Sequence, residues 1–163
     1  MIEDFWDEDA GLFHALHDGQ PVPVVTPFNL YPLWTGQLPD QIRDRLIAHL
    51  ADPGQFWGTY AIPSVARGDP HYDPERMWRG PVWVNINYIF VEALRQVGEF
   101  ELARDLREKT LRLIKEQGIT TVIVEQNAVA ALKLADRAVI LDIGKVVFDG
   151  SAKEGLENEA LPA

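Results

Sequence analysis

The chain has 163 residues, of which 47% are hydrophobic and 25% charged, and its formal charge is −10. Phosphate backbones and anionic lipid surfaces are bound by clustered Lys and Arg, so this balance argues against nucleic acid or an anionic membrane as a partner. Because the sequence has no cysteine, disulfides, thiol nucleophiles and zinc sites built on thiolate are excluded.

The first ten residues are acidic and hold no apolar segment flanked by basic residues, so we expect no secretory signal. The sequence also has no run of about 18 apolar residues, which predicts no membrane span. The expected location is therefore the cytoplasm.

Three helices are predicted before residue 118. The first begins after Pro39 and ends before residues 52–54, which read Asp-Pro-Gly, and helical spacing relates its apolar residues Ile42, Leu46, Ile47 and Leu50. The second has its apolar face at Ile86, Ile89, Phe90, Ala93, Leu94 and Val97. The third starts after Glu99, runs to about Gln117, and has its face at Leu102, Leu106, Thr110, Leu113 and Ile114. The short link at Gly98 predicts an antiparallel helical hairpin.

A long segment rich in Pro, Tyr and Trp, residues 55–81, separates the first two helices. Loops of this length in compact domains usually carry function, so the segment is a candidate site.

The composition changes near residue 115. All Trp, Tyr and His and all but one of the eleven Pro precede it, and Phe148 is the only aromatic residue after it. Strands are predicted at 120–124, 138–141 and 145–148, with a turn at 142–144. Asn127 is a candidate N-cap for a helix through Leu134, and Ser151 with Glu154 has the capping-box spacing of a last short helix.

Residues 77–88 read Met-Trp-Arg-Gly-Pro-Val-Trp-Val-Asn-Ile-Asn-Tyr, and they carry a family resemblance. Supporting segments precede them: 26–33, Gly36, 52–53, Phe56, Gly58, Tyr60, 62–64 and 69–70. Together they resemble glycoside hydrolase family 63 and the related mannosylglycerate hydrolase and trehalase-like enzymes. The resemblance implies an (α/α)6 barrel, with the sugar pocket at one end, and inverting hydrolysis by two carboxylic groups.

The candidate substrate-binding residues are Trp78, Arg79, Trp83 and Asn85. Aromatic planes suit the apolar faces of sugar rings, and Arg and Asn can hydrogen-bond the hydroxyls. The alternative is that both Trp side chains pack in the core and Arg79 pairs with an acid. Both interpretations remain open from the sequence.

The chain departs from the family at the catalytic groups. The resemblance implies a general-acid Asp upstream of this region and a general-base Glu downstream of the helical hairpin, and no residue matches either. Asp69, Asp73, Glu75 and Glu92 are expected to be solvated charges. We therefore predict no catalytic residue, no cofactor and no metal site, and weak or absent hydrolysis.

A second resemblance begins at residue 116. Residues 116–127, 130–141 and 144–150 resemble the end of the ATP-binding subunit of branched-chain amino acid ABC importers. The sequence has no Gly-x-x-x-x-Gly-Lys-Ser/Thr loop and no signature loop, so ATP binding is not expected.

The predicted architecture is mostly α, with part of an (α/α)6 barrel in residues 1–115, followed by a small α/β tail in residues 116–163 that forms the C-terminal fragment of an ABC ATPase-like domain. Three functions remain: a carbohydrate-related glycosidase fragment, which we favour, a transport ATPase remnant, and a fusion product without selected activity. The expected partners are a sugar and further copies of the chain, because part of a barrel exposes apolar faces and unpaired strand edges.

Overall fold

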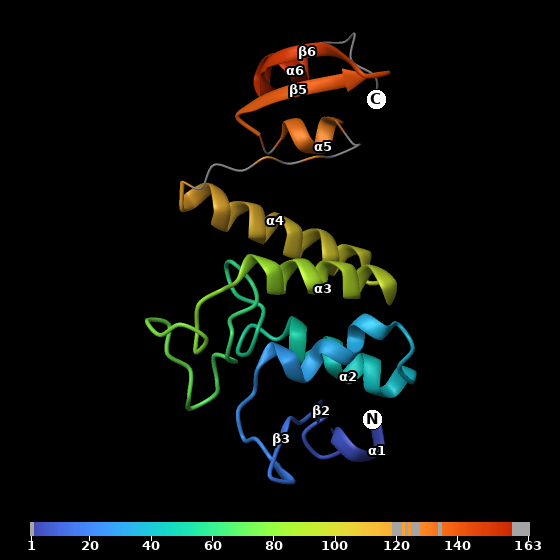
Figure 1. The fold of residues 1–163 in the computed structure, drawn as a ribbon, viewed down its shortest axis with the longest axis vertical. Helices are drawn as coiled ribbons and strands as arrows, with labels where there is room; N and C mark the ends of the chain where they lie inside the picture. Colours follow the sequence, from blue (N-terminus) through green and yellow to red (C-terminus); the bar gives the residue numbers. More distant parts are fainter. Residues whose placement is uncertain (1, 119–121, 123, 125–127, 134, 158–163) are drawn as a thin grey trace. The chain divides into compact units, whose positions relative to one another are not determined.

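The computed structural model describes residues 2–118, 122, 124, 128–133 and 135–157. These residues belong to two compact units, Met1–Gln117 and Gly118–Ala163, which are described separately (Figure 1). The first unit is mostly helical, and the second combines a β-hairpin with short helices. The predicted fold class, a partial helical domain followed by a small α/β tail, is confirmed.

The three helices predicted before residue 118 are all present. Helix α2 spans Asp40–Ala51, α3 spans Val84–Gln96 and α4 spans Phe100–Glu116. Helices α3 and α4 pack against each other as a hairpin (Figure 1). Gly98 in the link has a φ of +85°, a conformation that a residue with a Cβ rarely adopts, so glycine suits this turn.

The first 35 residues form small elements that the sequence did not predict: α1 (Ile2–Phe5), the hairpin of β1 (Trp6–Asp7) with β2 (Leu12–Phe13), the hairpin of β3 (Leu16–His17) with β4 (Gln20–Pro21), and the 3-10 helix η1 (Pro27–Thr35). Strands of two residues are too short to show an alternating pattern. Helix η1 begins where the backbone N–H of Thr26 donates to Asn29 Oδ1 at 2.7 Å. It then contacts both α2 and α3.

The core of the first unit lies between η1, α2, α3 and α4. The side chains of Leu30, Leu46, Phe56, Phe90 and Leu106, which come from all four elements and the long loop, are fully buried. Burial of each such side chain contributes about 1.5–3 kcal/mol. The loop is therefore part of the core through Phe56.

The segment from Gln55 to Pro81 contains no helix and no strand, as predicted. It begins in a turn in which the carbonyl oxygen of Asp52 accepts the N–H groups of Gln55, Phe56 and Trp57 at 2.9–3.0 Å. The indole of Trp57 then donates to Asp105 on α4 at 2.8 Å. These contacts attach the start of the loop to the helical hairpin.

The second unit consists of α5 (Ala128–Leu132), β5 (Arg137–Asp142), β6 (Lys145–Ser151) and α6 (Ala152–Glu157). Strands β5 and β6 pair antiparallel, so the two later predicted strands are confirmed. The predicted capping box is also present, since the Glu154 N–H donates to Ser151 Oγ at 3.3 Å and the Ser151 N–H donates to Glu154 Oε2 at 3.0 Å. The strand predicted at 120–124 and the N-cap at Asn127 lie outside the described residues, apart from Val122 and Val124, which are not in a strand.

None of the helices in the described part of the chain combines the length and the apolar character that crossing a bilayer requires.

Candidate functional site

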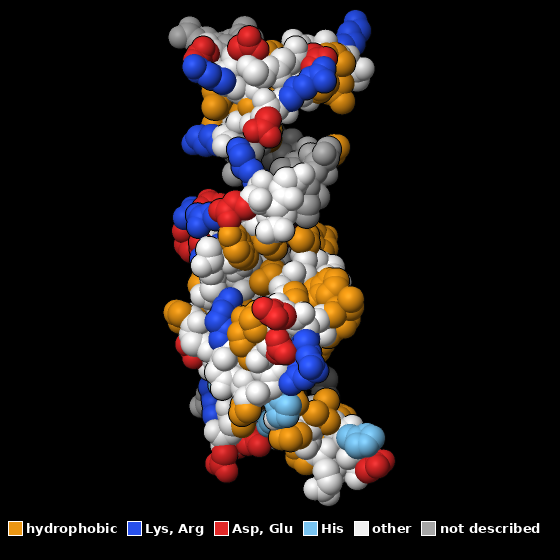
Figure 2. Space-filling view, turned by 90° about the vertical axis from the view of Figure 1, so that its left-hand side faces the viewer, with side chains coloured by type: hydrophobic (Ala, Val, Ile, Leu, Met, Phe, Trp, Pro, Cys, Tyr) orange, Lys and Arg blue, Asp and Glu red, His pale blue; other side chains and the backbone are white. Residues whose placement is uncertain are grey.

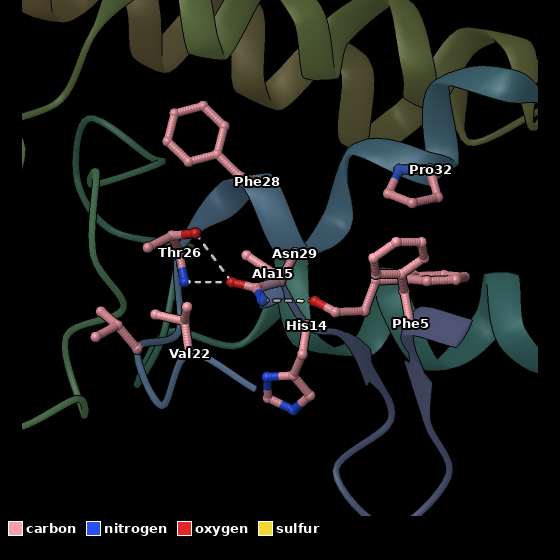
Figure 3. A pocket seen from close by; sticks show the side chains of 10 residues that line it. Phe5, His14, Ala15, Val22, Thr26, Phe28, Asn29 and Pro32 are labelled. Atoms are coloured by element: carbon pink, nitrogen blue, oxygen red, sulfur yellow. Dashed lines mark hydrogen bonds between the residues drawn. The ribbon is translucent and has the colours of Figure 1, made fainter. Parts of the chain in front are cut away.

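A cavity of about 460 Å³ lies beside η1 in the first unit (Figure 3). Its lining is mostly apolar and consists of Phe5, Phe13, His14, Ala15, Val22, Val24, Thr26, Phe28, Asn29 and Pro32. None of the four residues predicted to bind sugar is among them. The predicted site and the cavity are therefore separate features of the first unit.

The polar groups beside the cavity are largely used in local hydrogen bonds. Asn29 Oδ1 accepts from the backbone N–H and the hydroxyl of Thr26, and Asn29 Nδ2 donates to the carbonyl oxygen of Phe13 (Figure 3). His14 Nδ1 is buried without a hydrogen-bond partner among the described residues. Since a sugar presents many hydroxyls, which need several free donors and acceptors, this cavity suits a sugar poorly.

The two predicted tryptophans lie against each other. The rings of Trp78 and Trp83 stack, with centroids 4.3 Å apart and planes 11° from parallel. Trp78 is 49% exposed, whereas Trp83 is half-buried. The pair therefore presents one indole to solvent, supported from behind by the other, and leaves no space for a ring between them.

Arg79 follows Trp78 and is held at one nitrogen. Its Nε donates to the carbonyl oxygen of His71 at 3.1 Å. Neither of its outer guanidinium nitrogens has a hydrogen bond or an ion pair with another described residue. Among the described residues, Arg79 is therefore not paired with an acid.

Asn85 and Asn87 differ in burial although they are only two residues apart on α3. Asn85 is exposed in the first turn of α3. Asn87 is fully buried, where its Oδ1 accepts the Ile62 N–H at 3.3 Å and its Nδ2 donates to the Tyr60 carbonyl at 3.1 Å and to Thr110 at 2.9 Å. Sequence reasoning missed Asn87, and the available signal was a polar residue between the buried Ile86 and Phe90 of an apolar helix face.

The expectation of solvated charges is wrong for Asp69. Its side chain is only 3% exposed and accepts hydrogen bonds from the Val25 N–H at 2.8 Å, the His71 N–H at 2.7 Å and His71 Nδ1 at 2.9 Å. Burial alone would raise the pKa of Asp69, but these hydrogen bonds outweigh it and hold the pKa below its ordinary value of 3.8.

The other three carboxylates lie at the surface. Asp73 pairs with Arg76 at 3.3 Å and Glu92 with Arg95 at 3.2 Å, both within a helical or turn segment, and Glu75 is exposed. Across the part of the chain that the structure describes, no three His, Asp or Glu side chains are grouped so that they could hold a metal ion.

The first unit matches known glycoside hydrolases in sequence. A profile described as Mannosylglycerate hydrolase MGH1-like glycoside hydrolase domain matches residues 1–126. The mannosylglycerate hydrolase of Thermus thermophilus is 36% identical over 119 residues, which cover 72% of this chain and 28% of that protein. Mannosylglycerate hydrolase MGH1 of Selaginella moellendorffii is 31% identical over 122 residues, 72% of this chain and 24% of the relative.

A solved structure of a glycoside hydrolase is also similar to this chain. The GH63 mannosylglycerate hydrolase of Thermus thermophilus in complex with glucose superposes with a TM-score of 0.64 at 30% identity, covering 71% of this chain and 28% of that one.

A shorter sequence match is to a protein of Archaeoglobus fulgidus named as a probable branched-chain amino acid transport ATP-binding protein. It is 37% identical over 59 residues, which cover 36% of this chain and 25% of the relative.

The chain thus spans about a quarter of the length of the glycoside hydrolases that it matches. The profile covers most of the chain, including η1, the long loop and the α3–α4 hairpin. The chain belongs to the mannosylglycerate hydrolase MGH1-like glycoside hydrolase family.

Proposed function

We propose that the first unit is part of a glycoside hydrolase domain that binds a sugar on the exposed face of Trp78, and that this chain does not by itself hydrolyse the glycosidic bond. The observation that carries the proposal is the exposed indole of Trp78, which stacks on Trp83. Arg79, the next residue in the chain, is bound only at its Nε among the described residues. The exposed indole suits the apolar face of a pyranose, and guanidinium N–H groups are suitable donors to the hydroxyls at its rim.

The close stacking determines which face is used. Because the two ring centroids are 4.3 Å apart, a sugar cannot enter between the rings and must lie on the outer face of Trp78. Asn85, exposed at the start of α3, is a further hydrogen-bonding candidate. One related structure from Thermus thermophilus holds glucose, and another holds Tris and D-glycerate, which supports a polyol or sugar acid as the ligand class.

The carboxylates Asp69, Asp73 and Glu92 do not suit inverting hydrolysis. A general acid must stay protonated near neutral pH, which requires a raised pKa. The pKa of Asp69 is lowered instead, and both its oxygens accept hydrogen bonds. Asp73 and Glu92 pair with neighbouring arginines at the surface. We therefore expect binding without turnover.

The test combines binding and turnover in one sample. Glucose, mannosylglycerate, glucosylglycerate and glycerate are titrated against the purified full chain while tryptophan fluorescence is followed, and released sugar is then measured over several hours. We expect a saturable fluorescence change with at least one ligand and no product above the buffer blank. Sustained product release would contradict the assignment of inactivity, and the lack of any saturable change would contradict the binding surface.

A second candidate concerns residues 118–163. The match to a transport ATP-binding protein favours descent of this unit from the end of such a subunit, joined to the glycosidase segment near residue 115. We expect no ATP binding, because the sequence lacks a phosphate-binding glycine loop. Titration with ATP and magnesium tests this, and micromolar affinity would favour a retained nucleotide function. Long-read sequencing across codons 110–120 separates a genuine fused gene, in which the join is present in every read, from an artefact.

A further inference from the structure

A buried carboxylate connects two segments that are far apart in the sequence. Asp69 Oδ2 accepts the N–H of Val25, which is 44 residues away, at 2.8 Å. A backbone hydrogen bond connects the same two segments, since the Ala66 N–H donates to the Val25 carbonyl at 2.8 Å. Asp69 thus fixes the second half of the long loop to the segment that leads into η1.

The other oxygen of Asp69 holds His71. Asp69 Oδ1 accepts from both the backbone N–H of His71 at 2.7 Å and His71 Nδ1 at 2.9 Å. Because a carboxylate with a lowered pKa is an acceptor only, Nδ1 of His71 carries the proton in this pair. The His71 peptide is therefore held at its N–H and through its ring.

The carbonyl of His71 then contacts the proposed sugar-binding surface. It accepts Arg79 Nε at 3.1 Å, and the Arg79 carbonyl in turn accepts the Asp73 N–H at 2.9 Å. The segment from His71 to Arg79 is thus closed by one side-chain and one main-chain hydrogen bond. A continuous path of contacts connects Val25, Asp69, His71 and Arg79.

Trp78 needs such support, because its backbone is in an unfavourable conformation. Its φ is +63°, in the left-handed region that costs a residue with a Cβ about 1 kcal/mol or more. A loop adopts this conformation only if its other contacts define it. Gly80 packs against the same turn, where an added Cβ would lie 2.6 Å from the Asp73 carbonyl oxygen.

We infer that Asp69 is a positioning residue of the sugar-binding surface: through His71 it fixes the Arg79 side chain and the backbone that presents the Trp78 indole. This inference rests on the proposed function and deepens it, since it names the group that orders the surface. Asp69 itself does not contact the ligand. An amide at this position keeps one acceptor and turns an NH2 group toward either Val25 or His71, so Asp69→Asn should release one end of the path.

The experiment measures the conformation of the loop around Trp78 in the absence of ligand. The full chain is labelled with 5-fluorotryptophan, and the ¹⁹F resonances of Trp78 and Trp34 are assigned with single Trp→Phe variants. Asp69→Asn should shift or broaden the Trp78 resonance and leave that of Trp34 unchanged. The matched control is Asp52→Asn, whose carboxylate also accepts hydrogen bonds, from Gly54 at 2.8 Å and Gln55 at 2.8 Å, but has no contact with the path to Arg79.

A second pair of variants covers the case in which Asp69→Asn fails to fold. The side chain of His71 is 49% exposed, so its replacement leaves the core intact. His71→Leu removes the ring donor and should shift the Trp78 resonance, whereas His71→Asn, which places an N–H near the position of Nδ1, should restore it. An unchanged Trp78 resonance in His71→Leu and in folded Asp69→Asn would overturn the inference, as would an equal shift in Asp52→Asn.

Binding data separate this inference from the proposed function. If the wild-type chain binds a sugar, Asp69→Asn should weaken the affinity about tenfold, and Asp52→Asn should not. A tenfold loss is the effect expected when about one hydrogen bond no longer holds the binding residues in place. If the wild-type chain binds no sugar, the proposed function fails. The fluorine resonances still decide whether Asp69 orders the loop.

Discussion

Asn87 on α3 and Thr110 on α4 share a partly buried hydrogen bond of 2.9 Å across the helical hairpin. Asn87 donates through Nδ2, and the Thr110 hydroxyl donates its own proton to the Leu106 carbonyl at 2.7 Å. Asn87 also binds the backbone of Tyr60 and Ile62 in the long loop. One side chain therefore connects both helices of the hairpin with the loop that leads to the candidate site.

Asn87→Leu should destabilise the first unit by about 3 kcal/mol, because it leaves the Ile62 N–H and the Tyr60 carbonyl without their partner in a buried site. Urea unfolding followed by far-UV circular dichroism measures the change. Asn85→Ala is the control, since Asn85 is exposed on the same helix, and it should change the free energy of unfolding by less than about 0.5 kcal/mol. Equal losses in the free energy of unfolding in the two variants would show that the Asn87 hydrogen bonds do not contribute more than an exposed side chain.

The helices could be predicted because apolar residues recur at helical spacing, and the hairpin could be predicted from Gly98. The polar connection inside the hairpin could not. Thr110 occupies a position of the predicted apolar face of α4, and its hydrogen-bonding role depends on Asn87, which comes from another helix. The two-residue strands near the N-terminus were missed for a different reason, since they are too short to show a period.

Gly80→Ala should disorder the turn that presents Trp78. A Cβ at this position would lie 2.6 Å from both the Asp73 carbonyl oxygen and the Pro74 Cα, which are backbone atoms and cannot move aside without shifting the turn. The measurement is acrylamide quenching of tryptophan fluorescence together with the melting temperature, and we expect greater quenching and a lower midpoint.

Gly68→Ala is the matched control in the same loop. A Cβ there would meet only the Gly54 carbonyl oxygen at 3.5 Å, an ordinary van der Waals contact. Quenching and melting should therefore stay close to those of the parent chain. The steric account fails if Gly68→Ala and Gly80→Ala behave alike.

The residue types of the candidate surface could be predicted from the motif at 77–88, but its geometry could not. The stacking of Trp78 on Trp83 depends on a turn with an unfavourable φ, and such a turn has no sequence pattern of its own. Asp69 was misjudged because a carboxylate in a polar loop is usually solvated. Its burial depends on Val25, which is distant in the sequence.

Asp69 should make the stability pH-dependent in the acid range. Its pKa is lower in the folded chain than the ordinary value of 3.8, because the hydrogen bonds from Val25 and His71 outweigh the effect of burial. A carboxyl with a depressed folded pKa stabilises the fold fully above its unfolded pKa, and this contribution is lost as the pH falls through the folded value. The contribution of Asp69 therefore decreases as the pH falls below about 4.

Comparing the parent chain with Asp69→Asn isolates this contribution, because Asp7 and Asp52, whose pKa values are also lowered, are unchanged in both. The difference in the free energy of unfolding between the two chains should narrow as the pH falls from about 5 to about 3. A difference that stays constant over this whole range would mean that Asp69 is not held by these hydrogen bonds.

Self-association is expected from the exposed apolar side chains of the first unit. Large hydrophobic side chains lie at its surface (Figure 2), among them Phe28, Trp34, Tyr88 and Phe100, which are 49–65% exposed. Exposed apolar surface of this kind favours association. Sedimentation velocity should show larger species that increase with concentration, and Phe28→Ser with Phe100→Ser should reduce them. A single 18.4 kDa species at every concentration would refute the prediction.

The most direct test of sugar binding at Trp78 is isothermal titration calorimetry. The wild-type chain, Trp78→Ala and Trp34→Ala are each titrated with the sugar that gives the largest fluorescence change. Trp78 and Trp34 are both 49% exposed, so the two variants remove equal-sized, equally accessible indoles from different places. We expect Trp78→Ala to abolish the binding heat and Trp34→Ala to retain the wild-type affinity. Undiminished binding by Trp78→Ala, or equal losses in the two variants, would contradict this expectation.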